Sequence, residues 1–511
     1  AEAERQRARL HLACDGDAAL TARILPFVGL LRRDSFDMPV VIPAGGLYVT
    51  AGSQRRDTGT HYTPRPLTEL IVAATLEPHV YDGPAEGLPR GQWRLRSPDA
   101  LLSLKVCDMS MGSGAFLVQA CRYLAERLLE AWNHTPPASP LPEDAEERAA
   151  LARRMVADRC LYGVDNNPLA VEMAKLSLWL ITLQKERPFT FLDHALRCGD
   201  ALLGIVSAQQ LEDFSLTPEK GALVFGSTDM REAVRAAREA RDALERLPSD
   251  TPLNVERKAA CLAEAETHVA RLRLRADALI LAALRARGKL EESARYQLVD
   301  KLLHPAFCHD ADALARWLEE ERRALLRGGG TATTAKAADA NPGLTHPLHW
   351  ALEFPEVFER ENPGFDALVG NPPFLGSQRM REALGNAYRE YLVEVLAGGQ
   401  RGQADLVAYF FRRAAQLTRA GGDFGLIATN TLAQGDTREV GLLPLERAGC
   451  RIRAAWPDLP WEGNATVCTS QVVIRRPGAR PYDGPILLNG APVNTISSFL
   501  KAGEEDWEAR P

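Results

Sequence analysis

The sequence predicts an α/β fold with a parallel sheet, helices on both faces and an inserted α-helical hairpin. Residues 56–215 and 344–480 alternate short apolar runs with segments of helical spacing, which is typical of consecutive βα units. Between them, residues 216–343 are rich in Ala, Arg, Glu and Leu, with charges four residues apart. That pattern favours long helices, so we expect the insertion to divide one α/β unit into two parts.

Composition limits the possible classes of function. The chain has 511 residues, of which 46% are hydrophobic, and a net charge of −6. A basic excess, common in nucleic-acid binders, is therefore missing, and any such binding needs a local patch or another subunit. No apolar run is long enough for a membrane span, and the nine cysteines form no CxxC pair or metal-binding spacing. We expect a cytoplasmic protein with no membrane segment and no metal.

Three further segments flank the predicted core and its insertion. Residues 1–55 combine a short helical start with the strand-like piece "PVVIPAGGLYVT". The Gly-rich stretch 327–343 is expected to be a flexible linker at the end of the insertion. Residues 481–511 are expected to begin a C-terminal segment, and the first residue is Ala, so we expect a piece of a longer protein. The arginines of the insertion leave two interpretations open, a phosphate-binding surface or a solvated helix face.

The first candidate site lies in "LKVCDMSMGSGAFLVQA", residues 104–120. A short apolar strand ends at Asp108, and a turn with Gly112 and Gly114 leads into a helix. This arrangement suits a nucleotide-like cofactor, because glycines allow a close approach to the backbone beside a helix N-terminus. It is neither a GxGxxG nor a phosphate-loop motif. A carboxylate here would repel pyrophosphate and attract an ammonium or sulfonium group, and S-adenosylmethionine (AdoMet) carries both.

Two more acids follow along the chain, at positions expected near the ends of the next two strands. Asp165 ends the apolar run 160–164 just before a helix predicted to begin near Pro168, and Asp200 lies in "RCGDALLG". Asp165 is placed to accept hydrogen bonds from ribose hydroxyls, and Asp200 to accept one from an adenine amino group. Each acid alone is typical of a turn or a helix cap. Three in this order predict a cofactor site.

The ordered motifs resemble the gamma class of methyltransferases that modify the exocyclic amine of adenine in DNA. The similarity is greatest to type IIG restriction–modification methylases and to methylases of phage-defence systems such as BREX and DISARM. The matching stretches are "TGTHYTPRPLTELIV" (58–72), "DMSMGSGAFL" (108–117), "LYGVDNNPLAVEMAKLSLWL" (161–180), "CGDALLG" (198–204), "LHWALEFPEVF" (348–358), "FDALVGNPPF" (365–374), "ADLVAYFFRRAAQLTRAGGDFGLIATNTL" (404–432) and "NATVCTSQVVI" (464–474).

The resemblance implies a Rossmann-like AdoMet-dependent methyltransferase sheet that acts on double-stranded DNA, with other subunits of a defence system as possible partners. It assigns a set of residues to AdoMet binding: Tyr62, Thr63, Pro64, Asp108, Met109, Gly112, Gly114, Phe116, Asp165, Asn166, Asp200, Ala201 and Asn371. Met109 departs from the family, which usually has Pro after the first acid. We expect weaker preorganisation of that turn and no loss of binding.

The segment "LVGNPPFLG" (368–376) carries the predicted chemistry. An Asn-Pro pair is a common turn, so this motif alone proves little. In the family, however, the Asn371 side-chain oxygen and the Pro372 carbonyl accept the two protons of the adenine amine. That turns the nitrogen lone pair towards the methyl donor. Pro372 and Pro373 hold these acceptors in place, and Phe374 offers a face to a base extruded from the duplex. The resemblance thus predicts adenine N6 methylation.

Several alternatives remain open. The same motif serves RNA-base and protein-glutamine methyltransferases, and a methylase fold can also act as a non-catalytic DNA-recognition subunit. C5-cytosine methylation is disfavoured, because no cysteine follows a proline. No convincing PD…ExK pattern is present, so we expect this chain alone not to cut DNA. Trp456 and Trp461 are candidates for contact with the extruded base, although simple packing is the role we expect for either.

Overall fold

A computed structural model describes residues 2–33, 38–41, 63–137, 140–218, 227–286, 292–304, 310–328, 346–461 and 468–503. The chain forms two compact units, Ala1–Arg56 and Asp57–Pro511. In the first unit the described elements are α1 (Glu2–Ala13), α2 (Ala18–Ile24) and the 3-10 helix η1 (Leu25–Leu30). The Asp17 side chain caps α2 by accepting a hydrogen bond from the backbone N–H of Leu20.

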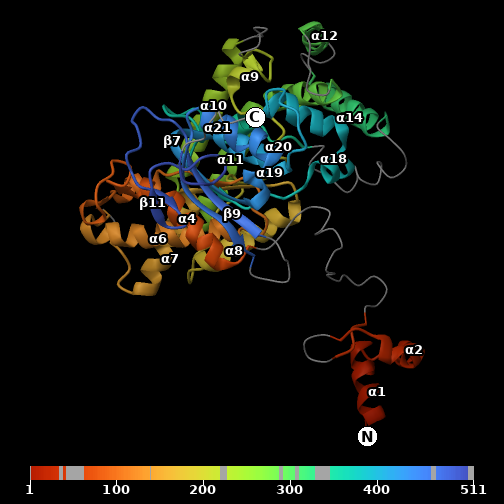
Figure 1. The fold of residues 1–511 in the computed structure, drawn as a ribbon. Helices are drawn as coiled ribbons and strands as arrows, with labels where there is room; N and C mark the ends of the chain where they lie inside the picture. Colours follow the sequence, from red (N-terminus) through yellow and green to blue (C-terminus); the bar gives the residue numbers. More distant parts are fainter. Residues whose placement is uncertain are drawn as a thin grey trace. The chain divides into compact units, whose positions relative to one another are not determined.

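The second unit is built on a nine-stranded sheet with the order β11-β10-β8-β9-β7-β6-β3-β4-β5. Figure 1 labels β7, β9 and β11 of this sheet. Its strands are β3 (Val106–Asp108), β4 (Leu161–Asp165), β5 (Leu196–Cys198), β6 (Phe365–Gly370), β7 (Thr418–Thr429), β8 (Arg451–Pro460), β9 (Cys468–Arg475), β10 (Ile486–Leu488) and β11 (Ala491–Val493). Strands β5, β4, β3, β6 and β7 are mutually parallel. Strand β9 runs antiparallel to both its neighbours, β7 and β8. This confirms the predicted α/β fold.

Strands β3 and β6 lie side by side at the centre of the sheet, although the whole insertion separates them in the sequence. From β3 the chain continues outward to β4 and β5, and from β6 it continues outward in the opposite direction to β7. The strand order therefore reverses between β3 and β6. In open α/β sheets, ligands bind outside the carboxyl ends of the strands at such a switch point.

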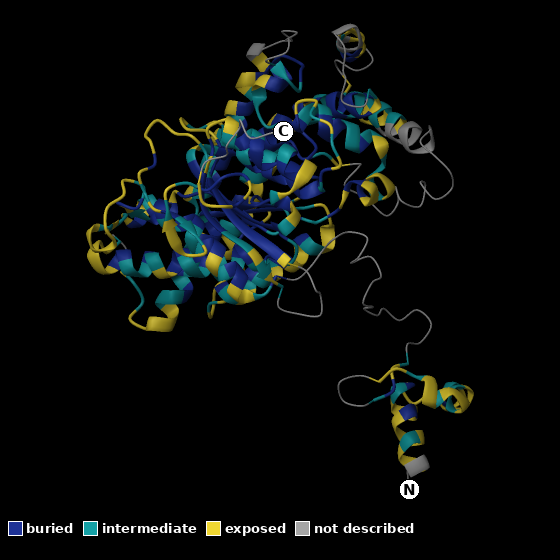
Figure 2. Cartoon of the chain, viewed as in Figure 1, coloured by how far each residue is buried: buried dark blue, intermediate teal, exposed yellow. Residues whose placement is uncertain are grey.

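The two faces of the sheet belong to separate hydrophobic cores. On β6, Leu368 lies in one core and Ala367 and Val369 lie in the other, as expected for a strand buried on both faces. Figure 2 shows the central strands in the colour of buried residues. The core of Ala367 is covered by α4 (Arg65–Val80), α5 (Pro98–Leu102), α6 (Ala115–His134), α7 (Ala145–Arg159) and α8 (Pro168–Thr182). The core of Leu368 is covered by α16 (Trp350–Glu353), α17 (Pro355–Phe358), α18 (Ser377–Tyr391), η5 (Leu392–Leu396), α19 (Leu406–Leu417), η6 (Asn430–Ala433), α20 (Gly435–Val440) and α21 (Leu442–Arg447).

The segment between β5 and α16 is largely helical where the structure describes it. Its elements are α9 (Ala208–Glu212), α10 (Ser227–Arg246), α11 (Pro252–Arg285), α12 (Glu292–Leu303) and α14 (Ala311–Gly328). Helices α10 and α11 form a hairpin, as the charge pattern predicts, and α12 and α14 add two helices beyond it. Thr251 caps α11 through its side-chain oxygen, and Pro252 occupies the first turn. The stretch 329–345, which includes most of the expected linker, lies outside the described residues.

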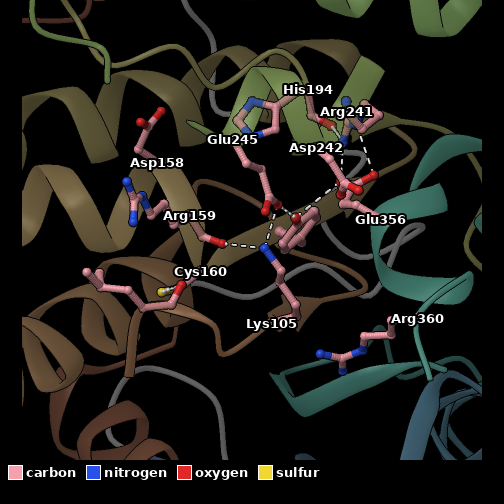
Figure 3. Close-up of polar contacts among 12 residues, drawn as sticks. Lys105, Asp158, Arg159, Cys160, His194, Arg241, Asp242, Glu245, Glu356 and Arg360 are labelled. Carbon is pink, nitrogen blue, oxygen red and sulfur yellow. Dashed lines mark hydrogen bonds and ion pairs between the residues drawn. The ribbon is translucent and has the colours of Figure 1, made fainter. Parts of the chain in front are cut away.

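Buried polar contacts attach α10 to the sheet (Figure 3). The Arg241 guanidinium donates to the Glu356 carboxylate, with a Nε–Oε2 distance of 2.9 Å, and both side chains are buried. One helical turn further, Glu245 accepts hydrogen bonds from the Lys105 ammonium and from the Tyr162 hydroxyl, the latter at 3.0 Å. Lys105 and Glu356 precede β3 and β6 in the sequence, so α10 is fastened near the amino ends of these strands.

A second buried ion pair attaches α11. The Lys258 Nζ lies 2.6 and 2.7 Å from the two carboxylate oxygens of Asp158, at the end of α7. Burial raises the pKa of Asp158 while the nearby ammonium opposes that rise, and the Ser249 hydroxyl donates to the same carboxylate at 2.9 Å. Because Asp158 precedes β4, this contact also lies at the amino end of the sheet. The α10–α11 hairpin is therefore an integral part of the core.

The sheet continues past the expected end of the core at residue 480. Strand β10 pairs in parallel with β8, and β11 pairs with β10, which adds two strands to this edge. A separate two-stranded ribbon is formed by β1 (Tyr81–Asp82) and β2 (Arg94–Leu95), next to the 3-10 helix η2 (Arg90–Gln92). In the described part of the chain, no helix combines the length and apolarity needed to cross a bilayer.

Candidate active site

The loop after β3 is shaped by two glycines. Gly114 has φ 85° and stands at the N-cap of α6, where a Cβ atom would lie 3.2 Å from the Cα of Ala174 on α8. Both the positive φ and the close packing therefore require glycine. Gly112 also has positive φ, at 52°, but a Cβ atom there would meet nothing within 4 Å. The loop is thus packed firmly on its inner side and open beside Gly112.

Asp165 links the second strand to this loop. Its Oδ2 accepts a hydrogen bond from the backbone N–H of Gly112 at 2.9 Å, and its Oδ1 accepts one from Asn167 at 2.9 Å. The Asn167 side chain in turn caps α8, which begins at Pro168 as predicted. The adjacent Asn166 is exposed. Burial raises the pKa of Asp165, and the two backbone donors oppose that rise.

Asp108 is completely buried at the carboxyl end of β3. Its Oδ1 accepts a hydrogen bond from the Ser110 backbone at 3.0 Å, whereas its Oδ2 has no partner among the described residues. Burial raises the pKa of Asp108 to about 8, and the negative charge of Asp165 adds to the rise. A buried carboxylate oxygen without a donor is costly, so this atom is suited to a ligand that brings a cation or an N–H group.

Gly370 brings the two halves of the sequence together. A Cβ atom at this position would lie 2.7 Å from the Asp108 Oδ1, so only glycine allows β6 to pass so close to the first acid. The next residue is Asn371. Its Nδ2 donates a hydrogen bond to the Thr63 hydroxyl at 3.1 Å, and its Oδ1 is buried without a hydrogen-bond partner in the part of the chain that the structure describes. Thr63 therefore fixes the orientation of the amide and leaves its oxygen available as an acceptor.

The remaining residues of the NPPF motif and its neighbours are placed as follows. Pro372 is buried, Pro373 is half-buried, and Phe374 is half-buried with contacts to both hydrophobic cores. Pro64 directly precedes α4 as its N-cap residue. Tyr62, the first residue of the predicted Tyr-Thr-Pro motif, lies outside the described residues.

Asp200 lies after β5 and is held mainly from within the protein. Its Oδ1 accepts hydrogen bonds from the backbone N–H groups of Leu202 and Leu203, at 2.9 and 3.3 Å. The Tyr388 hydroxyl, on α18, lies 2.9 Å from the Oδ2. Burial raises the pKa of Asp200 to about 6, although these hydrogen bonds oppose the rise. The adjacent Ala201 is buried, and its carbonyl accepts a hydrogen bond from the Trp350 indole at 3.1 Å.

Four predicted residues pack into the protein. Met109 is buried in the core of Leu368, and Phe116 in the core of Ala367. Trp456 and Trp461 are half-buried and pack against the core of Ala367. The structure thus brings Thr63, Asp108, Gly112, Asp165 and Asn371 together through contiguous contacts. Sequence reasoning missed the roles of Tyr388 and Gly370. Tyr388 stands in none of the motifs, and the motif that contains Gly370 does not show that this residue lies against Asp108.

Two family models match the chain on either side of the insertion. The model described as N-6 DNA Methylase matches residues 47–196, which contain Asp108 and Asp165. The model described as Eco57I restriction-modification methylase matches residues 278–440, which contain Asn371. In these two segments the chain is similar to the N6-adenine DNA methylases of restriction–modification systems. The two parts of the candidate site therefore fall in two segments that match such methylases independently.

The chain is also similar to a curated protein of a restriction–modification system. The chain is 20% identical over 434 residues to RM.MjaORFECS2P of Methanocaldococcus jannaschii, a protein named as a type II restriction enzyme and methyltransferase. The alignment covers 76% of this chain and 33% of the M. jannaschii protein. The chain thus spans about a third of the length of this relative.

Two solved structures of restriction–modification proteins are also similar to this chain. The type IIL restriction–modification enzyme MmeI in complex with DNA aligns at 16% identity and a TM-score of 0.39, over 95% of this chain and 47% of that one. The M protein of the type I restriction enzyme EcoKI aligns at 11% identity and a TM-score of 0.30, over 93% and 54%. The chain therefore spans about half the length of each.

Proposed function

We propose that the protein is an AdoMet-dependent methyltransferase that methylates the exocyclic N6 amine of adenine in DNA, within a restriction–modification or phage-defence system. The observation that carries this proposal is a pair of unpartnered acceptors on adjacent strands. The Asp108 Oδ2 and the Asn371 Oδ1 are both buried without hydrogen-bond donors, and Gly370 holds the two residues close together. One acceptor suits a cationic cofactor and the other suits an amine substrate.

The residues of the loop fit AdoMet. A buried carboxylate oxygen without a donor, at Asp108, matches an ammonium or sulfonium group, and the open side of Gly112 gives the backbone access to a ligand. Asp165 stands next to this opening and has lone pairs left for ribose hydroxyls. When bound, AdoMet supplies an electrophilic methyl group on sulfur, so no metal or covalent enzyme intermediate is required.

The chain's own contribution is to prepare the amine. The lone pair of an adenine amine is delocalised into the ring, which makes the nitrogen a poor nucleophile. The Asn371 Oδ1 and the Pro372 carbonyl would accept its two protons and direct the lone pair out of the ring plane. Thr63 holds the Asn371 amide in the required orientation through the 3.1 Å hydrogen bond. Because these acceptors are positioned before the substrate arrives, the site is preorganised for transfer.

Transfer of a labelled methyl group from AdoMet to duplex DNA tests the proposal, with the methylated position mapped by sequencing. Asn371→Ala should reduce the rate by at least about 100-fold, the effect of removing one preorganised polar group from an active site. The matched control is Asn362→Ala, because Asn362 is exposed and precedes the amino end of the same strand. It should transfer normally.

The substrate class is tested in the same assay. RNA and a glutamine-containing protein replace DNA in parallel reactions, and label on either one in place of DNA would contradict the DNA assignment. DNA binding without transfer to any acceptor would favour a non-catalytic recognition subunit. Equal rates for the Asn371→Ala and Asn362→Ala proteins would remove the proposed role of Asn371.

A further inference from the structure

Helix α8 is apolar on both its inner and its outer face. Its inner face, with Val171, Ala174 and Leu178, is buried against the core of Ala367. Six large apolar side chains on and just after the helix are nevertheless exposed by 49 to 66%: Leu169, Met173, Leu176, Leu180, Leu183 and Phe189. A helix that is apolar all round is normally buried on all sides, so the outer face of α8 lacks the contact that its composition predicts.

The spacing of these residues defines the shape of what would cover them. Within α8 the exposed apolar positions Leu169, Met173, Leu176 and Leu180 advance by four, three and four residues, and Leu183 comes directly after the last helical residue, Thr182. This is the repeat of a coiled-coil seam, which packs against another helix at a shallow crossing angle. We call these five residues, together with Phe189, the α8 seam. Phe189 broadens it from the side, because its ring stacks on Trp179 with a centroid distance of 4.9 Å.

We propose that the α8 seam is a dimerisation surface, and that its occupant is the α8 seam of a second copy of this chain in antiparallel orientation. The spacing is nearly symmetric about Leu176. In an antiparallel pair, Leu176 would meet its own counterpart, Leu169 would meet Leu183, and Met173 would meet Leu180. A two-fold axis requires such a self-complementary patch.

The area and charge of the seam agree with this occupant. Half-exposed side chains of this size show roughly 100 Å² each, so the seam offers on the order of 600 Å², close to the ~800 Å² that each partner buries in a standard interface. Few charges interrupt it. Glu172 borders the seam, and its carboxylate is already paired at 2.8 Å with Lys175, which also contacts Asp193. Two copies would therefore come together without placing like charges in contact. A neutral apolar surface has no groups that bind phosphates, so the seam does not suit nucleic acid.

Sedimentation equilibrium of the full chain tests the oligomeric state from about 1 to 100 µM. We expect a concentration-dependent species of twice the 56.0 kDa mass of the chain. Leu176→Glu places a charge at the two-fold axis and should weaken dimerisation by at least about 100-fold. The matched control is Leu253→Glu, because Leu253 is equally exposed but lies alone at the start of α11. It should dimerise like the unmodified chain, and circular dichroism should show that both variants fold.

Cysteine crosslinking tests the antiparallel geometry, in a background where the exposed Cys198 and Cys468 are replaced by serine. Under mild oxidation, Leu176→Cys should form a covalent dimer with itself. Leu169→Cys should crosslink only when mixed with Leu183→Cys. A monomer at every concentration, or an unchanged dimer in Leu176→Glu, would overturn the proposal. Crosslinking of Leu169→Cys with itself would overturn the antiparallel arrangement.

Discussion

Two buried oxygen atoms, one on Asp108 and one on Asn371, have no hydrogen-bond donor among the described residues and lie together at the candidate site. Asp108 ends β3 and Asn371 directly follows the adjacent strand β6, where a Cβ atom on Gly370 would touch the Asp108 carboxylate. Each of these oxygen atoms is destabilising on its own, because a buried acceptor without a hydrogen-bond donor costs free energy. Together they form a site whose hydrogen bonds a ligand would complete.

The pKa of Asp108 leads to a prediction about cofactor binding. Burial raises it to about 8, so at neutral pH the free protein holds this carboxyl mostly protonated. A cationic ligand prefers the ionised form, so binding should release a proton. Between pH 6 and 7.5, AdoMet affinity measured by calorimetry should therefore rise by up to tenfold per pH unit. Asp108→Asn should bind more weakly and lack this rise, and parallel pH profiles would contradict the assignment.

The raised pKa of Asp108 also makes the stability of the folded protein depend on pH. The folded protein binds the Asp108 proton more tightly than the unfolded chain does. Its contribution to stability is therefore fully present below the ordinary carboxyl pKa and is lost as the pH rises through about 8. Bound AdoMet should offset that loss, because the ionised carboxylate then has a partner.

At the scale of elements, the α10–α11 hairpin shows where sequence reasoning succeeded and where it failed. Charges four residues apart predicted the helices, and a solvated face is present on α10, where Arg231 and Arg235 are exposed. The same pattern did not reveal that the structure buries Arg241 against Glu356 and Lys258 against Asp158. A charge pattern along one helix cannot reveal a partner 100 or more residues away, so the sequence showed the helices and not their attachment.

The ion pair of α11 predicts the cost of detaching it. Lys258→Met leaves the Asp158 carboxylate buried without its cation, which should lower the free energy of unfolding by about 3–5 kcal/mol. The double variant Asp158→Asn/Lys258→Met should recover much of this loss, because no uncompensated charge remains. Urea unfolding followed by circular dichroism measures both. Purely additive losses would show that the two side chains do not depend on each other.

At the scale of the whole molecule, the sequence predicted the sheet well because the acids mark its strand ends. Asp108 and Asp165 end β3 and β4, and Asp200 follows β5. The prediction ended the core at residue 480, because β10 and β11 are three residues each and too short for a periodic pattern. Tyr388, which donates to Asp200, follows no motif at all, since only the folded chain brings α18 against that loop.

The division into two units gives a prediction for truncation. All described residues of the candidate site belong to the unit Asp57–Pro511, and none belongs to Ala1–Arg56. A protein consisting of residues 57–511 should therefore bind AdoMet within about twofold of the full chain, a difference well under 1 kcal/mol. Calorimetry at a single pH measures this, with Asp108→Asn as the weak-binding reference. A loss as large as that of Asp108→Asn would assign part of the binding to residues 1–56.

The hydrogen bond between Thr63 and Asn371 joins residues 308 positions apart in the chain. During synthesis on a ribosome, the first acids emerge long before the strand that must lie beside them. The free edge of β3 can pair only after the helical segment has been made and β6 has followed it. The nascent polypeptide thus carries an unpaired edge of β3 while residues 109–364 are made, and the pocket cannot form before Asn371 has emerged.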